Sequence, residues 1–170
     1  MVYIDKIKIA PKPFFIWGLA ALIVMSLIFL ASSQQGDESG ELSLWVTDIT
    51  VGTVWRIVGA QGEEMPDGFA RVAEFTIRKA AHFAIYFMLA FCVGNAVRAL
   101  TPKKSTVFWV ALIWGSAYGA LDEFYQTFIP GRVGIWYDWL INSAGAFVAA
   151  VLVVKLLMRK RRDEQAEGAQ

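Results

Sequence analysis

The stretch FFIWGLAALIVMSLIFLA, residues 14–31, contains no charged side chain and is long enough to cross a bilayer as a helix. A hydrocarbon core about 30 Å thick requires roughly 17–25 apolar residues in a helix. Three further apolar stretches have a similar length and cover residues 80–100, 106–124 and 135–158. Hydrophobic residues make up 56% of the 170-residue chain, compared with about 45–50% in soluble domains. The sequence therefore predicts an all-α polytopic membrane protein, a bundle of four transmembrane helices.

Residues 14–31 have a second interpretation as a secretory signal peptide. Lysines precede the stretch, and the small residues Ala31, Ser32 and Ser33 end or follow it. The apolar part of a signal peptide is only about 7–15 residues long. An uncleaved helix is therefore favoured, and cleavage would leave three spans.

The distribution of Lys and Arg predicts the orientation, because these residues favour the cytoplasmic side of short loops. They gather before the first span, between the second and third, and after the fourth (Lys6, Lys8, Lys12; Arg98, Lys103, Lys104; Lys155, Arg159, Lys160, Arg161, Arg162). Residues 32–75 instead hold eight acidic and two basic residues. We expect both termini to be cytoplasmic and residues 32–75 to be external, although Arg78 and Lys79 then lie on the unfavoured side.

The external segment is predicted to contain a short amphipathic helix on the bilayer surface. Its apolar residues recur at helical spacing (Leu42, Trp45, Val46, Ile49). Gly and Pro residues then break the chain (Gly59, Gly62, Pro66, Gly68). A new helix, capped by Asp67, is expected to continue into the second span. Residues 1–162 would form one membrane domain, followed by a disordered polar tail at residues 163–170.

Composition also excludes several classes of function. The formal net charge is +1, and no basic stripe that could follow a phosphate backbone is present, so we expect no nucleic-acid partner. Cys92 is the single cysteine and lies in an apolar stretch, which excludes an intrachain disulfide and a thiolate metal site. No recognised metal spacing occurs, and any cofactor is unknown. Gly115 and Gly119 form a GxxxG pair, which we interpret as a helix-packing surface.

Polar and ionisable side chains concentrate at one end of the predicted bundle. In the expected topology the second and fourth spans start, and the third ends, on the external side. Their candidate residues would meet there (Lys79, His82 and Tyr86; Asp122, Glu123 and Gln126; Arg132 in the following turn; Asp138 and Asn142). Charges near hydrocarbon cost about 2.5 kcal/mol or more unless they are paired or hydrated, so such residues are functional candidates.

Structural and chemical interpretations of this cluster both remain open. Three basic residues (Arg78, Lys79, Arg132) balance three acidic ones (Asp122, Glu123, Asp138), as a purely structural salt-bridge network requires. Alternatively, His82 could act as a general base or hydrogen-bond donor, and Lys79 with Arg132 could bind a phosphate. Carboxylate oxygens could also hold Mg²⁺ or Ca²⁺. Asp122 and Glu123 are adjacent and cannot share one helix face, so we expect one to face the cluster and the other a neighbour or the headgroups.

These residues resemble motifs of the VanZ-like family of membrane proteins, known for teicoplanin resistance. RKAAHFAIY at residues 78–86 is similar to K-x-x-H-F-x-x-Y, and DEFYQTFIPGR at 122–132 to D-E-x-x-Q-x-F-x-P-x-R. DWLINSAG at 138–145 is similar to D-x-x-x-N-x-x-G. The resemblance implies a multi-pass protein of the bacterial cytoplasmic membrane, in some members linked to lowered susceptibility to teicoplanin-type glycopeptides. The biochemical activity that it implies is not established.

Two main functions follow from these observations. The first is a non-enzymatic envelope factor that binds an anionic lipid headgroup or a lipid-linked cell-wall precursor (through Lys79, Tyr86, Gln126, Arg132, Asp138 and Asn142). The alternative is a membrane-embedded hydrolase or transferase with His82 as general base and Asp122 or Glu123 as acid or metal ligand. No nucleophile motif accompanies the second hypothesis, so binding is preferred. Ion transport is a third hypothesis, and a homo-oligomer remains open.

Overall fold

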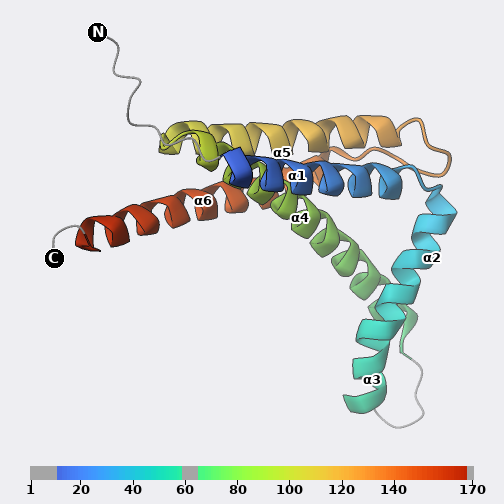
Figure 1. Cartoon of the computed structure of the whole chain (residues 1–170). Coiled ribbons are helices and arrows are strands. Elements are labelled where there is room, and N and C mark those ends of the chain that lie inside the picture. Colours follow the sequence, from blue (N-terminus) through green and yellow to red (C-terminus); the bar gives the residue numbers. More distant parts are fainter. Residues whose placement is uncertain (1–10, 59–64, 168–170) are drawn as a thin grey trace.

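The regular structure is entirely helical in the part of the chain that the computed structural model describes, residues 11–58 and 65–167. The elements are α1 (Pro11–Ser32), α2 (Gly36–Thr47), the π-helical η1 (Asp48–Gly52), α3 (Thr53–Val58), α4 (Asp67–Leu100), α5 (Lys104–Gln126) and α6 (Trp136–Glu167). Helix α4 contacts α1, α5 and α6. Figure 1 shows α2 and α3 projecting from the far end of α1, beside the first part of α4. The all-α prediction is confirmed.

Three helices within the described ranges are long and apolar enough to cross a membrane. They are Lys12–Ser32 in α1, Asp67–Leu100 in α4 and Trp136–Arg159 in α6. Helix α5 covers the predicted span 106–124 and has 23 residues, but it does not belong to this group. Trp, Tyr, Gly and Ser residues lower its mean hydropathy, and Asp122 and Glu123 end it. Composition therefore identifies three of the four predicted spans.

Helix α4 is continuous over 34 residues, as the sequence predicts. At about 1.5 Å per residue it is roughly 50 Å long, well beyond the hydrocarbon thickness of a bilayer. The predicted cap is wrong in detail, because Asp67 is the first helical residue and Pro66 precedes it as the N-cap. Phe69 and Ala70 donate backbone hydrogen bonds to the carbonyl of Pro66 (2.9 and 3.0 Å). Asp67 still stands in the first turn, where a negative charge favours the helix dipole.

Two other predicted boundaries differ from the structure. Helix α6 continues through Glu167, so the prediction of disorder is wrong for residues 163–167. That segment is rich in residues with high helix propensity, which can extend a helix that packing has already nucleated. The predicted breaks at Gly59 and Gly62 lie outside the described residues.

The predicted amphipathic segment forms α2 and continues as η1 and α3, so helical structure extends beyond the short helix expected. Its apolar side chains are exposed rather than packed, and Trp45 is 63% exposed. At its far end the Trp55 and Phe69 rings lie 5.4 Å apart, which brings α3 against the start of α4.

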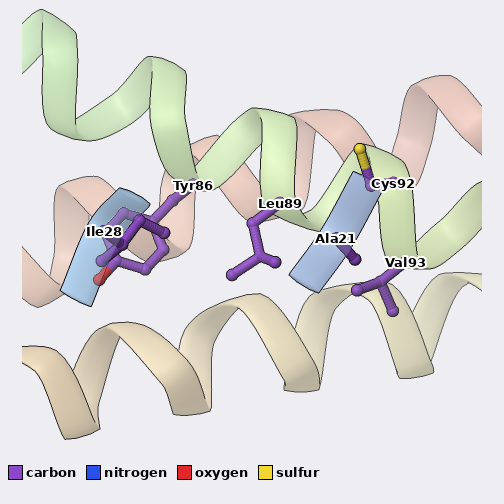
Figure 2. Close-up of a cluster of buried hydrophobic side chains, with 6 residues drawn as sticks. All are labelled: Ala21, Ile28, Tyr86, Leu89, Cys92 and Val93. Carbon is purple, nitrogen blue, oxygen red and sulfur yellow. The ribbon is translucent and has the colours of Figure 1, made fainter. Parts of the chain in front are cut away.

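The core is built from small and medium side chains at the crossing of α1 and α4. Figure 2 shows this cluster, with Tyr86 and Ile28 at one end and Cys92 and Val93 at the other. The GxxxG prediction is confirmed as packing, because a Cβ at Gly115 would lie 2.7 Å from the Cβ of Ala146. Small residues thus let the helices approach closely. In a bilayer such close packing stabilises the contact between helices, because the hydrophobic effect contributes little there.

Candidate functional site

The candidate residues lie at the end of the bundle where α1 and α5 end and α6 begins. Gly36, the first residue of α2 and four residues after the end of α1, donates a backbone hydrogen bond to the carbonyl of Pro130 (3.1 Å). A Cβ at Gly36 would overlap the carbonyl of Gly131, which itself has a φ of +74°. Glycine at both positions allows the backbones to touch. The α5–α6 connection is thereby fixed against the end of α1.

One part of the cluster joins α4 to α6. The Lys79 ammonium forms an ion pair with the Asp138 carboxylate, and the two side chains are only 14% and 11% exposed. One turn further along both helices, His82 Nδ1 donates to Asn142 Oδ1 (3.3 Å). A Cβ at Gly145 would overlap the backbone carbonyl of Phe83 in α4. Aspartate, asparagine and glycine of the third motif therefore form one continuous contact surface on α6.

Glu123 fixes the start of α6. Its Oε2 accepts a hydrogen bond from the backbone N–H of Ile135 (3.0 Å), immediately before the first helical residue. Such a bond satisfies one of the amide groups that lack a partner at a helix N-terminus. Its neighbour Asp122 instead accepts from Gln126 Nε2 (3.1 Å). The prediction that the two adjacent carboxylates face different neighbours is confirmed.

The other part of the cluster surrounds a cavity of about 250 Å³ between α1, α2, α4 and α5. Seven ionisable or strongly polar residues line it (Gln34, Arg78, His82, Tyr86, Asp122, Gln126, Arg132). Apolar side chains complete its walls (Ile28, Leu42, Val46, Ile77, Ile85). Five of the nine predicted site residues therefore line the cavity, whereas four do not (Lys79, Glu123, Asp138, Asn142).

Arg132 connects this cavity to the end of α1. Its guanidinium donates to the carbonyls of Ala31 (3.0 Å) and Gln34 (3.3 Å), and to Gln126 Oε1 (3.4 Å). A guanidinium has five N–H donors, so about two remain for another acceptor. Burial, and then the nearby charge of Arg78, lowers the pKa of Arg132 from its ordinary value. The group nevertheless stays protonated in a protein.

Arg78 is a charged residue of the cavity wall that was not predicted as a site residue. It forms an ion pair with Glu74, one turn earlier in α4, and its side chain is 39% exposed. From the sequence, Arg78 is expected only as an exception to the predicted orientation or as part of a salt-bridge network. The available signal was its spacing, since Arg78, His82 and Tyr86 are each four residues apart and share one helix face.

Within the described residues, no group of three or more His, Cys, Asp or Glu side chains is arranged to hold a metal ion. The three carboxylates proposed as Mg²⁺ or Ca²⁺ ligands have separate partners: Gln126 for Asp122, Ile135 for Glu123 and Lys79 for Asp138. The geometry therefore gives no support to metal binding by these three residues.

Buried polar atoms without a partner occur on both parts of the cluster in the described ranges. The cavity wall carries Ser43 Oγ and the Tyr86 hydroxyl, while Glu123 Oε1 and Asn142 Nδ2 lie away from it. The Asp122 carboxylate lies close enough to the Tyr86 hydroxyl to interact with it electrostatically and as a hydrogen-bond acceptor of relaxed geometry. Because most buried polar groups in proteins are hydrogen-bonded, unpartnered groups on a cavity wall need an explanation.

Long apolar helices with a buried polar cluster at one end are typical of polytopic membrane proteins. The chain belongs to the VanZ/LLP1 family, whose model matches residues 17–159. That range contains all three motifs and every residue of the cavity wall. No curated protein and no solved structure matches the chain.

Proposed function

We propose that this protein spans the bacterial cytoplasmic membrane four times, with both termini in the cytoplasm and the cavity on the outer side. The outer face of α5 supports a fourth span, because its large apolar side chains are exposed (Trp109, Ile113, Leu121, Phe124), while small residues (Ala111, Gly115, Gly119) form the middle of its inner face. A bilayer would cover that apolar face. The exposed apolar residues of α2 and α3 then suit the outer headgroup layer.

The cavity, in this proposal, binds an anionic lipid headgroup or the headgroup of a lipid-linked cell-wall precursor. The observation that carries it is the wall itself, where Arg78 and Arg132 stand beside a row of apolar side chains. A guanidinium pairs well with phosphate oxygens, and the apolar wall suits the start of an acyl or polyprenyl chain. Arg78 takes the phosphate-binding role that the sequence assigns to Lys79, because Lys79 lies off the cavity wall in a nearly buried pair with Asp138, whereas Arg78 lines the wall and its pair with Glu74 is partly exposed.

Family membership extends the proposal to glycopeptide antibiotics, because the VanZ family is generally linked to teicoplanin resistance. Teicoplanin-type drugs are anchored in the membrane by a lipid chain. A protein that occupies the same lipid layer and holds lipid-linked precursors or headgroups would compete with such a drug. We therefore expect lowered susceptibility to teicoplanin rather than to an unanchored glycopeptide such as vancomycin.

The experiment compares teicoplanin and vancomycin susceptibility of a sensitive host that expresses the wild type, Arg78→Gln or Arg132→Gln. Membrane abundance is measured in the same cells. Arg56→Gln is the matched control, because Arg56 pairs with Asp48 on the exposed segment and neither residue lines the cavity. Loss of teicoplanin protection by normally abundant Arg78→Gln, with protection kept by Arg56→Gln, would support the proposal. Full protection by both cavity variants would refute it.

A catalytic function is the second candidate, favoured by the position of His82. The ring lines the cavity, and its Nδ1 is held by Asn142. In the neutral ring the other nitrogen is then an acceptor, as a general base requires. Wild-type protection by an abundant His82→Ala variant would exclude this role, and it would leave the binding proposal intact.

A further inference from the structure

Arg78 has a counter-ion within the chain itself. Its guanidinium forms an ion pair with the Glu74 carboxylate, one turn earlier in α4, and the two side chains are 39% and 19% exposed. Arg78 lines the cavity, whereas Glu74 does not. The pair therefore joins the cavity wall to a carboxylate outside the cavity.

The second arginine of the wall is balanced as well. Arg132 donates to Gln126 Oε1, and Gln126 Nε2 donates to the Asp122 carboxylate, so one amide links the two charges. With Glu74 counted, the arginines of the wall leave no surplus of positive charge. A phosphate can use the remaining N–H groups of Arg132, but it gains the charge of Arg78 only if the Glu74 carboxylate moves away.

Arg78 is the arginine that can change its partner. Arg132 is held by two backbone carbonyls and one side-chain oxygen. Among the described residues, Arg78 donates only to Glu74. A partly exposed pair one turn apart on a helix contributes little to stability. The Arg78 side chain can therefore turn from Glu74 to a ligand while the backbone contacts of the site stay in place.

The two guanidiniums lie close enough to share one ligand. After burial, the charge of Arg78 is the main cause that lowers the pKa of Arg132, so the two side chains repel each other. A phosphate bound between them would interact with both and offset that repulsion. This gain favours the exchange of Glu74 for a phosphate, because the Glu74 carboxylate pairs with only one of the two arginines.

The displaced carboxylate has a second cation within reach. Arg71 lies three residues before Glu74, and residues three or four apart on a helix are neighbours. Arg71 is exposed and forms no ion pair with the described residues. The Glu74 carboxylate can thus move from Arg78 to Arg71 along one side of α4.

We propose that Glu74 is a displaceable counter-ion that controls access to Arg78: a lipid phosphate in the cavity takes its place, and the carboxylate turns to Arg71. The inference rests on the proposed function, because it describes how the same site is regulated. Neutralising Glu74 should therefore tighten the binding of anionic lipids, although this residue lies outside the cavity wall.

The test uses the full-length protein in phosphatidylcholine nanodiscs, with retention of added phosphatidic acid measured by native mass spectrometry. Glu74→Gln should raise retention about threefold to fivefold, because the ion pair no longer opposes binding and a nearby negative charge is removed. Asp48→Asn is the matched control, since it also removes a carboxylate from an ion pair, and neither Asp48 nor its partner Arg56 lines the cavity. The control should retain phosphatidic acid as the wild type does.

A double-variant cycle tests whether Glu74 acts through Arg78. In the Arg78→Gln background, Glu74→Gln should lose most of its gain, because the guanidinium for which the carboxylate competes is absent. An equal gain in both backgrounds would mean that Glu74 acts only as a distant charge, and it would overturn the inference.

A second pair of variants tests where the displaced carboxylate goes. Arg71→Gln should lower retention about twofold, because the carboxylate loses its alternative partner. Arg56→Gln removes the same charge from the exposed segment and should leave retention unchanged. Equal retention in these two variants would overturn the exchange with Arg71.

The outcomes separate the inference from the proposed function. No preference for phosphatidic acid over phosphatidylcholine, in the wild type and in Glu74→Gln, overturns both. A preference that Glu74→Gln leaves unchanged, or that Asp48→Asn raises equally, overturns the inference while the cavity remains an anionic-lipid site. Excess inorganic phosphate should displace little of the lipid, and full displacement would overturn a lipid as the source of the phosphate. If Glu74→Gln fails to accumulate, Glu74→Ala provides the test, and unchanged retention in that variant overturns the inference.

Discussion

Two faces of α4 between residues 78 and 86 differ in how they use their charges. The face toward α6 is closed, with Lys79 paired to Asp138 and His82 hydrogen-bonded to Asn142. The face toward α1 and α5 is hollow, with Arg78 and Tyr86 on its wall, and His82 lies at the boundary because its ring lines the cavity as well. We call these the closed face and the cavity face. The structural and functional interpretations of the cluster thus apply to different faces of one helix.

Breaking the ion pair of the closed face should lower the free energy of unfolding of the protein more than any other change considered below. In Lys79→Met the Asp138 carboxylate remains nearly buried without its cation, which costs about 3–5 kcal/mol. Thermal unfolding of the purified protein in detergent micelles measures the loss, with membrane abundance as a second readout. A loss below about 1 kcal/mol would mean that the pair is effectively hydrated, like a surface salt bridge.

The double variant Lys79→Met with Asp138→Leu separates pairing from packing. Removing both charges leaves no buried unpaired group, so most of the stability should return. If the double variant is as unstable as Lys79→Met alone, the loss comes from packing and not from the stranded carboxylate.

Gly145→Ala should have the second-largest effect. The added Cβ would overlap the carbonyl of Phe83 and force α6 away from α4, at a cost of about 1–3 kcal/mol. Gly18→Ala is the matched control, because a Cβ there meets nothing within 4 Å. Since alanine favours a helix over glycine, the control should be neutral or slightly stabilising in the same unfolding assay. Equal unfolding temperatures for the two variants would contradict close α4–α6 contact.

Sequence patterns predicted the elements and much of the contact pattern of the site. Apolar length and helical spacing located the four long helices, and the spacing of Lys79 with His82 and of Asp138 with Asn142 matches their contacts. The rotation of α4 was not predictable, because consecutive helical residues point about 100° apart. Arg78 and Lys79 could therefore exchange roles until the neighbouring helices were known.

The contribution of α2 to the cavity was also beyond sequence reasoning. Its apolar spacing predicted a surface helix, but not that Leu42, Ser43 and Val46 would line a wall shared with α4 and α5. That arrangement depends on the contact between Gly36 and Gly131, which joins segments almost one hundred residues apart. Close backbone approach between distant glycines leaves no periodic signal in a single sequence.

Glu123→Ala tests the contact by which α5 fixes the start of α6. Loss of the hydrogen bond to the Ile135 amide should cost about 1 kcal/mol, as for other helix caps. Glu123→Gln keeps an acceptor oxygen at this position and should recover most of the loss. The same detergent unfolding assay distinguishes the two, and identical values would show that the cap contributes nothing.

Arg78→Gln should have the smallest effect on stability and the clearest effect on binding. Its ion pair with Glu74 is a partly exposed pair one turn apart, which contributes only about 0.2–0.5 kcal/mol. A charge-assisted hydrogen bond to a phosphate contributes more, about 1.5–3 kcal/mol, so anionic-lipid retention should fall about tenfold or further. Thermal unfolding and native mass spectrometry on one preparation give both values. A large loss of stability with unchanged lipid retention would mean that Arg78 has a structural role like that of Lys79. The two faces of α4 would then not differ in function.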